Sequence, residues 1–335
     1  MATAPDWGTT DAQCAYYSML HVGARRMWVI PGILAATSLL SSLAQEPIKV
    51  RVNLVNVAFT ARDARGALVE NLTKDDLELF EDTVPQKIEF FSRSTDLPLT
   101  LALVMDVSGS QEHFEKKHEK DLEVFLKDVL GPRDRAFMVC FGNHLRLVSD
   151  YTNSAEQILS NFHEFDKGKR HFPEIGPEEE RDLGTAFYDS IYYSVREKLA
   201  LEEGGRQAIL MFSDGEDNSS SHNLMTAIEA AQSANVVIYT IRYTEPNKHG
   251  ELNARNKYGI SVMERIAKET GGAHIDAQHT DPHTYFLEIA EELRTSYELA
   301  YYPTNKAKDD TFRKIRVKVK DDSIKVRAKT GYFSP

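Results

Sequence analysis

One apolar run sets the strongest limit on what this chain can fold into. Residues 99–105 read Leu-Thr-Leu-Ala-Leu-Val-Met, without a charge and without alternation. Such a run is typical of a strand that is covered on both faces, as in a parallel sheet. Helical and strand patterns then alternate as far as residue 296, and each helix can serve as a crossover between parallel strands. The sequence therefore predicts a doubly wound, mostly parallel α/β domain over residues 98–295.

The expected elements of this domain follow from hydrophobic periodicity and turn residues. Strands are expected at 99–105, 136–141, 145–149, 208–212, 236–242 and 274–275. Helices are expected up to Leu130 and at 154–165, 184–200, 223–234, 260–270 and 282–296. Gly142-Asn143 joins two of the strands as a hairpin, which predicts an antiparallel edge.

The two ends of the chain read as β-structure. Residues 48–97 alternate apolar and polar positions, with a single helical turn starting at Thr73 between short strands. Residues 297–335 return to the same pattern, most strictly in 312–319. Three strands at either end are too few to bury a core alone. We therefore expect both ends to pair into one small all-β sandwich, with the α/β domain inserted between them.

The carboxyl-terminal β-segment is basic within an acidic chain. Residues 306–329 hold ten Lys or Arg and four Asp or Glu, whereas the whole chain has a net charge of −11. Two interpretations stay open: a solvated outer sheet face or protected edge, and a strip that binds a polyanion. The overall charge argues against a protein that coats nucleic acid or anionic lipid.

The amino terminus predicts an export signal. Arg25-Arg26 precedes an apolar run and the small residues Ser42 and Ala44, which is the pattern of a secretory signal peptide over residues 1–44. A retained membrane anchor and a twin-arginine signal are alternatives, although the run is short for spanning. Met19 or Met27 would be a more natural start for such a signal. After cleavage we expect no membrane span and a periplasmic or extracellular location in the cell envelope.

Cleavage before Gln45 would leave 291 residues and remove Cys14. Cys140 would then be the single thiol, and its apolar neighbours predict a buried core position. Two cysteines exclude both a disulfide framework and a zinc site of the Cys-x-x-Cys type.

Polar residues follow the predicted buried strands where the strands end. Asp106-Val-Ser108-Gly-Ser110 follows the first strand, Gly184-Thr185 opens a helix, and Ser213-Asp214-Gly215 follows a later strand. Ligands bind at the carboxyl ends of strands in open α/β sheets. Carboxylate and hydroxyl oxygens suit a hard cation, so the pattern predicts a site for Mg²⁺, or for Ca²⁺ or Mn²⁺.

In order and context, this set resembles the metal-ion-dependent adhesion site (MIDAS) of von Willebrand factor type A (VWFA) domains, which have a Rossmann-like fold. The matching residues are Asp106, Ser108, Ser110, Thr185 and Asp214. The β-ends, including Leu-Thr-Lys-Asp-Asp-Leu-Glu-Leu-Phe-Glu-Asp and the closing Lys-Thr-Gly-Tyr-Phe, resemble the exported VWFA-related proteins of Acidobacteria.

The resemblance implies adhesion through the metal rather than catalysis. Asp106, Ser108 and Ser110 would bind the ion directly, and Thr185 and Asp214 directly or through water. An acidic side chain of a protein partner would complete the shell. The charged loop 166–183 precedes Thr185 and is the candidate for partner selectivity. The alternative is a remnant site that only stabilises its loop.

Other chemistry has weaker support. Ser108 and Ser110 lack a Gly-x-Ser-x-Gly elbow, and no histidine stands at a spacing that suggests a base. The spacing of His274, His279 and His283 is only loosely zinc-like. His113 and His118 are expected on a solvated helix face. We therefore expect an exported, non-catalytic protein-binding module, with a structural or assembly component of the envelope as the alternative.

Overall fold

Strand β5 (Leu99–Asp106) lies inside a six-stranded sheet, and all eight of its residues are buried. In the computed structural model, the described residues are 54–94, 97–111, 114–177, 184–202, 204–244, 249 and 251–334. The predicted signal peptide lies outside them. The chain divides into two units between Val50 and Arg51, and all the described residues belong to the second unit.

The six-stranded sheet has the order β10-β9-β8-β5-β6-β7, and only its β6–β7 pair is antiparallel. Its other strands are β6 (Arg135–Phe141), β7 (Leu145–Thr152), β8 (Arg206–Ser213), β9 (Val237–Arg242) and β10 (His274–Asp276). The prediction of a mostly parallel, doubly wound sheet is confirmed, including the hairpin at its antiparallel edge.

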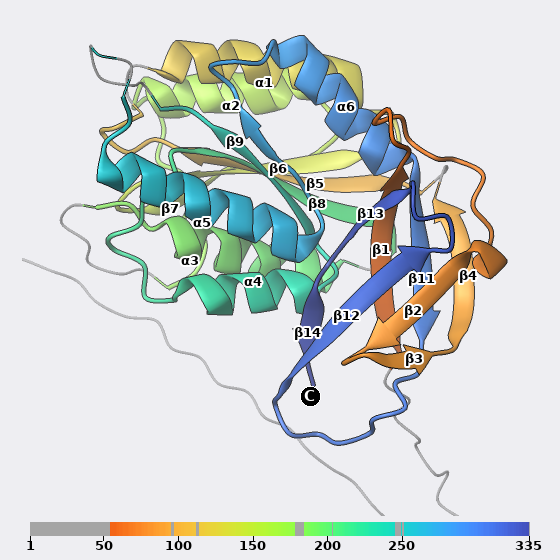
Figure 1. Cartoon of the computed structure of the whole chain (residues 1–335). Coiled ribbons are helices and arrows are strands. Elements are labelled where there is room, and N and C mark those ends of the chain that lie inside the picture. The colour runs from red at the N-terminus through yellow and green to blue at the C-terminus, as the bar shows by residue number, and fades with distance from the viewer. Residues whose placement is uncertain are drawn as a thin grey trace, which may run out of the picture. The chain divides into compact units, whose positions relative to one another are not determined.

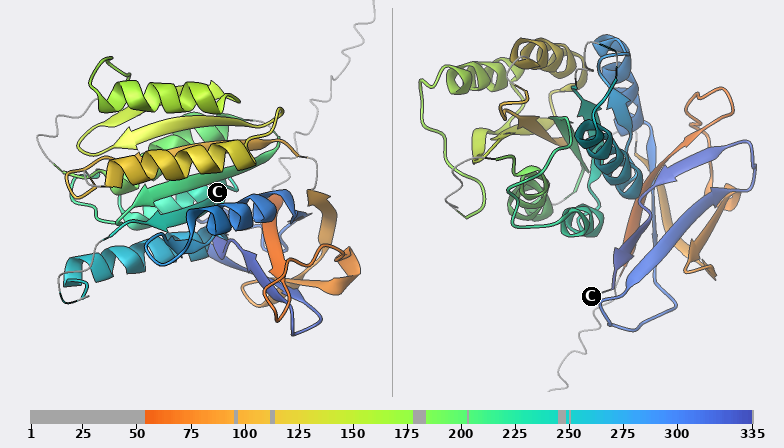
Figure 2. Two further views of the ribbon diagram at one scale, coloured as in Figure 1. Left: turned by 90° about the horizontal axis from the view of Figure 1, so that it is seen from above. Right: turned by 60° about the vertical axis from the view of Figure 1, so that its left-hand side comes forward.

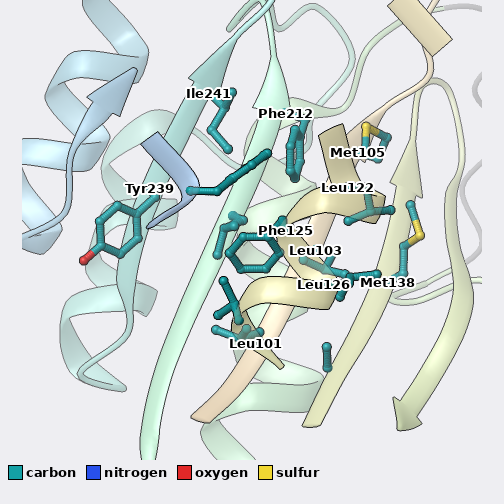
Figure 3. Packing of buried hydrophobic residues seen from close by; sticks show 14 of the residues in the cluster. Leu101, Leu103, Met105, Leu122, Phe125, Leu126, Met138, Phe212, Tyr239 and Ile241 are labelled. Carbon is teal, nitrogen blue, oxygen red and sulfur yellow. The ribbon is translucent and has the colours of Figure 1, made fainter. Parts of the chain in front are cut away.

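Helices cover both faces of this sheet (Figures 1 and 2). One face packs against α1 (Glu115–Val129), α2 (Ala155–Asp166) and α6 (Pro282–Arg294). The other packs against α3 (Phe187–Tyr193), α4 (Leu224–Ser233) and α5 (Ala254–Thr270). Figure 3 shows the first of these cores, where Phe125 and Leu122 of α1 meet Leu103 of β5.

Two four-stranded sheets form the β-sandwich, and each combines strands from both ends of the chain. Their orders are β13-β1-β11-β4 and β14-β12-β2-β3. The bounds are β1 (Val55–Arg62), β2 (Leu77–Glu81), β3 (Val84–Gln86), β4 (Ile88–Ser94), β11 (Ser296–Tyr301), β12 (Phe312–Val319), β13 (Lys325–Ala328) and β14 (Gly331–Phe333). The predicted pairing of the two ends is therefore present, while the predicted domain boundaries remain a prediction.

The sandwich core consists of residues at alternate positions of these strands. Tyr297, Leu299 and Tyr301 of β11 point inward, and the ring of Tyr297 stacks on Phe59 with 5.2 Å between centroids. The alternation places Glu298 on the opposite side of β11, next to Ala58 of β1. That outer side of the sheet faces the α/β domain, because Ala58 and Glu298 line a common cavity with the start of β8.

An ion cluster around a buried carboxylate joins the two parts of the fold. Glu292 of α6 accepts hydrogen bonds from Arg62 of β1 at 2.6 Å and from Arg327 of β13 at 2.9 Å. The hydroxyl of Tyr239 of β9 donates to the same carboxylate at 3.0 Å. Glu292 is 4% exposed at its side chain. One carboxylate thus links strands from both ends of the chain to the α/β sheet.

Three local predictions can be compared with the structure. Helix α5 begins six residues before the predicted start at 260, where the side chain of Asn253 caps it by accepting from the Asn256 amide. The helix predicted at 184–200 is α3, followed by a π-helical turn at Ser194–Lys198 and a 3₁₀ turn at Leu199–Leu201. The 3₁₀ turn at Lys74–Asp76, by contrast, begins after Thr73 as predicted, with Asp76 accepting from the Thr73 backbone and hydroxyl.

The expectation of a solvated His118 is wrong, while His113 lies outside the described residues. The side chain of His118 is 1% exposed and contacts the edge of Tyr243, with ring centroids 4.3 Å apart. Burial lowers the His118 pKa to about 3. Cys140 is buried as predicted. Among the described helices, none has the length and apolar character needed to cross a membrane.

Candidate metal centre

The candidate centre lies where β5 and β8 end side by side. The two strands are parallel neighbours with Met105 opposite Phe212, so Asp106 and Ser213 occupy adjacent positions at the same edge of the sheet. The connection after β5 leads to α1 on one face, and the connection after β8 leads to α4 on the other. A crevice at such a reversal is the usual ligand position in open α/β sheets.

Asp106 is the most deeply buried member of the predicted set, with no exposed surface. Its Oδ2 accepts a 2.6 Å hydrogen bond from the hydroxyl of Ser213, and its Oδ1 accepts from the Ser108 amide at 3.0 Å. Burial, and secondarily the nearby Asp214 carboxylate, raise the Asp106 pKa to about 7. Two carboxylates therefore share a poorly solvated space, an arrangement that a cation between them would stabilise.

A chain of side-chain contacts connects the two loops. The hydroxyls of Ser108 and Ser110 lie 3.2 Å apart, and Ser110 donates to Oδ2 of Asp214 at 2.7 Å. The amide of Gln111 donates to the same oxygen at 3.0 Å and to the carbonyl of Tyr243. Direct contacts thus link Ser108, Ser110 and Asp214, and the Ser108 amide extends the chain to Asp106.

Thr185 is positioned beside this cluster by its backbone. Its amide donates to Oδ1 of Asn218 at 2.7 Å, and the next amide, of Ala186, donates to the carbonyl of Gly142. A Cβ atom on Gly142 would lie 3.7 Å from the backbone of Ser108, so the Thr185 segment and the Ser108 loop flank the same glycine. The structure records no hydrogen bond from the Thr185 hydroxyl to the other four residues within the described part of the chain.

Two facing glycines fix the Asp214 turn against α5. Gly215 has a φ of +80°, and a Cβ atom there would lie 2.4 Å from the carbonyl oxygen of Gly259. A Cβ atom on Gly259 would in turn lie 2.3 Å from the carbonyl oxygen of Asp214. This close backbone contact sets the position of the Asp214 side chain at the end of β8.

The chemistry of the donors fits a hard divalent cation. The set offers carboxylate and hydroxyl oxygens only, which are the ligands of Mg²⁺, Ca²⁺ and Mn²⁺ rather than of softer metals. Within the described ranges, no group of three or more His, Cys, Asp or Glu side chains is placed to hold a metal. The predicted set contains two carboxylates, and its other members are hydroxyl groups. It therefore falls outside this class of group, which contains at least three His, Cys, Asp or Glu side chains.

A cavity of about 390 Å³ borders Ser108. Phe165 and Gly184 also line it, together with His144, whose Nδ1 lies 2.8 Å from the Glu174 carboxylate. Phe165 directly precedes the charged 166–183 loop and Gly184 directly follows it, while residues 178–183 of that loop are not described. The ring of His144 therefore lies near a predicted ligand, which its position in the sequence did not indicate.

Sequence reasoning assigned no role to three residues that hold the site together: Ser213, Gln111 and Asn218. Ser213 directly precedes Asp214 at the end of a buried strand, and Gln111 directly follows Ser110. A polar residue directly beside a predicted ligand could have indicated that both residues belong to the site. Asn218 could not be assigned to Thr185 without knowing how the two loops meet.

Two of the loosely spaced histidines have separate partners. His274 contacts the hydroxyl of Thr240 at 2.9 Å, whereas His279 contacts the Asp276 carboxylate at 2.9 Å. Each of these two side chains thus has a local partner.

Comparisons with known proteins find solved structures that are distantly similar to this chain. No family model matches the chain, and no curated protein matches it. An aerotolerance-related membrane protein of Bacteroides fragilis is 15% identical over 58% of this chain and 98% of its own, with a TM-score of 0.46. Manganese-loaded TRAP from Plasmodium vivax is 15% identical over 72% and 96%, with a TM-score of 0.41.

A third solved structure is named von Willebrand factor type A, from Catenulispora acidiphila. It is 12% identical over 85% of this chain and 74% of its own, with a TM-score of 0.42. The doubly wound fold itself is established by the strand order and helix layers of this chain.

Proposed function

We propose that this chain is an exported, non-catalytic module that binds a protein partner through a divalent cation. Asp106, Ser108, Ser110, Thr185 and Asp214 would hold the ion. The ion would supply a positive centre for an acidic side chain of the partner. The observation that carries the proposal is the meeting of two carboxylates and two serine hydroxyls from separate loops at one edge of the sheet.

The surroundings of the site support a role in binding. Few protein charges would face the ion, because Asp106 and Asp214 are the carboxylates of the set. The ion would therefore keep affinity for an external carboxylate. The cavity beside Ser108 leaves room next to the loop, and its apolar wall includes Val107 and Phe165. We assign partner selectivity to this wall and to the charged loop that continues from it.

An alternative function is supported by the same hydrogen bonds. Ser110 and Gln111 already satisfy Asp214, and Ser213 satisfies Asp106, so protein groups alone hold the loops together. In that case the chain would be a structural or assembly component of the cell envelope, and the metal would be incidental.

Metal titration distinguishes a site that binds a cation from a remnant site that binds none. Calorimetry of the wild type with Mg²⁺, Ca²⁺ and Mn²⁺ is expected to show binding that Asp106→Ala abolishes and that Asp75→Ala, a change at an exposed carboxylate, leaves intact. The absence of heat with all three ions would refute the proposed metal site.

Affinity capture from the envelope then separates the two functions. Capture of a partner should fail with chelator and with Asp106→Ala if the metal mediates binding. A partner that survives both would favour the structural role. A hydrolase would instead show turnover on a substrate panel that is lost in Ser108→Ala, and we expect no turnover.

A further inference from the structure

A second cavity, of about 420 Å³, lies at the other end of β8. Arg206 and Gln207 at the start of that strand line it, and Asn56 and Glu298 line it from the outer side of the sandwich sheet. Strand β8 runs from Arg206 to Ser213, so at ~3.3 Å per residue the cavity is about 23 Å from the candidate metal centre. It is a separate place in the fold.

Arg206 enters this cavity as a buried cation without a direct partner. The residue is 5% exposed, and its Nη1 has no accessible surface and no hydrogen-bond partner. The structure records no ion pair for its guanidinium among the described residues. The nearby Glu292 carboxylate binds Arg62 and Arg327 directly. It acts on Arg206 only through its electrostatic field.

Glu298 provides an opposite charge in the same cavity. Alternation along β11 turns its side chain away from the sandwich core and toward the α/β domain. Burial raises the Glu298 pKa, and the field of Arg206 partly opposes that rise. The two groups therefore influence each other across the cavity, yet they form no ion pair of 4 Å or less within the described residues.

Two further polar residues of the lining, Glu202 and Gln207, form no hydrogen bond or ion pair with the side chain of Arg206 or Glu298 among the described residues. Glu202 is bound to Arg135, so its charge is already compensated. The Oε1 atom of Gln207 is buried without a hydrogen-bond partner, although its Nε2 donates to the Glu202 carbonyl. Among the described lining residues, Arg206 and Glu298 thus act on each other through their electrostatic fields without a direct contact, and the buried Oε1 of Gln207 lacks a partner.

Such an arrangement costs folding free energy unless something occupies it. A charged group that is removed from water without a close partner is strongly unfavourable, and buried polar atoms are nearly always paired. A ligand with matching charges would place an opposite charge beside each of the two side chains. The volume falls within the range of small-molecule sites.

We propose that this cavity binds a small zwitterion of the amino-acid or dipeptide class, with its carboxylate against Arg206 and its ammonium group toward Glu298. Arginine is suited to the first contact because its planar guanidinium can donate two hydrogen bonds to one carboxylate. The equal and opposite charges of the cavity favour a ligand of zero net charge over a simple anion. Binding here does not depend on the metal centre.

Calorimetric titration of the full chain tests this with four probes. Glycine and alanyl-alanine carry both charges, N-acetylglycine lacks the ammonium group, and glycinamide lacks the carboxylate. We expect at least one zwitterion to bind at least tenfold more tightly than both single-charge probes. No binding of either zwitterion at millimolar concentration would overturn the proposal and would mean that water fills the cavity.

Two substitutions assign the contacts. Arg206→Gln should weaken zwitterion binding at least tenfold, whereas Arg133→Gln, at an exposed position, should not change it. Glu298→Gln should weaken the zwitterion but not N-acetylglycine, and this variant decides the matter if Arg206→Gln does not fold. Unchanged zwitterion affinity in Glu298→Gln, or in folded Arg206→Gln, would contradict the assignment. Magnesium titration of each variant reports separately on the proposed function.

Discussion

The hydroxyl of Ser110 donates a 2.7 Å hydrogen bond to Oδ2 of Asp214, although 104 positions separate the two residues in the chain. This contact joins the loop after β5 to the loop after β8. The carboxylate of Asp214 also receives the amides of Gln111 and Glu216, so it is held from both loops. The geometry of the candidate centre therefore depends on a contact between two of its own predicted ligands.

Removing the Ser110 hydroxyl should separate metal binding from folding. Ser110→Ala loses the hydrogen bond to Asp214 and the contact with the Ser108 hydroxyl, which together cost about 1–2 kcal/mol, so the protein should still fold. Magnesium at a hundred times its Kd should stabilise the wild type by about 2.7 kcal/mol and the variant by clearly less. Thermal unfolding with and without magnesium measures both quantities. Ser261→Ala, at an exposed position of α5, should behave as the wild type, and an unchanged magnesium effect in Ser110→Ala would contradict its role as a ligand.

The glycine contact beside Asp214 should be intolerant of a methyl group. Gly259→Ala would place a Cβ atom 2.3 Å from the Asp214 carbonyl oxygen, so backbone must move. We expect a loss of about 1–3 kcal/mol in the free energy of unfolding, together with weaker metal binding. Denaturant unfolding and calorimetry check the two effects. The control is Gly109→Ala within the metal loop, where a Cβ atom meets nothing within 4 Å and little loss of stability is expected. Equal stability of the two variants would show that the contact does not constrain the turn.

The Glu292 cluster should dominate the interface between the sandwich and the α/β domain. Glu292→Ala leaves Arg62 and Arg327 without their shared carboxylate, and because their side chains are 23% and 36% exposed, the loss should stay below the ~3–5 kcal/mol of a fully buried pair. Urea unfolding measures this loss. Glu288→Ala on the same helix is exposed and should change stability by less than about 0.5 kcal/mol. A similar small effect at both positions would mean that the cluster contributes little.

Lys329 should make the free energy of unfolding depend on pH in the alkaline range. Its ammonium group is buried, with the Gln232 carbonyl 2.9 Å away, and burial lowers the Lys329 pKa to about 7 from 10.5. Between these values the unfolded chain binds one more proton than the folded chain. The free energy of unfolding should therefore rise by about 1.4 kcal/mol per pH unit from pH 7 toward 10.5, with no further contribution below 7.

Lys329→Met should remove this slope and raise stability at pH 7. Urea unfolding at several pH values, compared between variant and wild type, isolates the contribution of the one group. Lys325→Met, at an exposed position of the neighbouring strand, should retain the slope. An identical pH profile for wild type and Lys329→Met would show that Lys329 remains charged in the folded protein.

The sequence was sufficient for the fold because each long element carries its own pattern. The apolar run of β5 and the strict alternation of β12 state which faces are buried, and both strands occur where they were predicted. Short elements carry no such signal: β13 and β14 have four and three residues, so their pairing depends on partners far along the chain. His118 was misjudged because charged neighbours on its helix hide the one position that turns toward Tyr243.

The candidate site was predictable in its residue types and only partly in its contacts. Strand ends locate Asp106 and Asp214 at one edge of a parallel sheet, and this follows from sequence alone. The hydrogen bond from Ser213 to Asp106, by contrast, requires the register between β5 and β8. The same is true of the second cavity, since Arg206 and Glu298 become neighbours only when the sandwich packs against the α/β domain.

The shared strands of the sandwich have a consequence for biosynthesis. Strand β4 pairs with β11, and β1 pairs with β11 and β13, so neither pairs with another described strand in the first half of the chain, where β1 has only a single bridge to Leu68. About two hundred residues separate the end of β4 from the start of β11. At roughly 5–20 residues per second, a ribosome needs ~10–40 s to cross that interval. During this time the nascent chain exposes two unpaired strand edges, and these are the segments that a holding chaperone should protect.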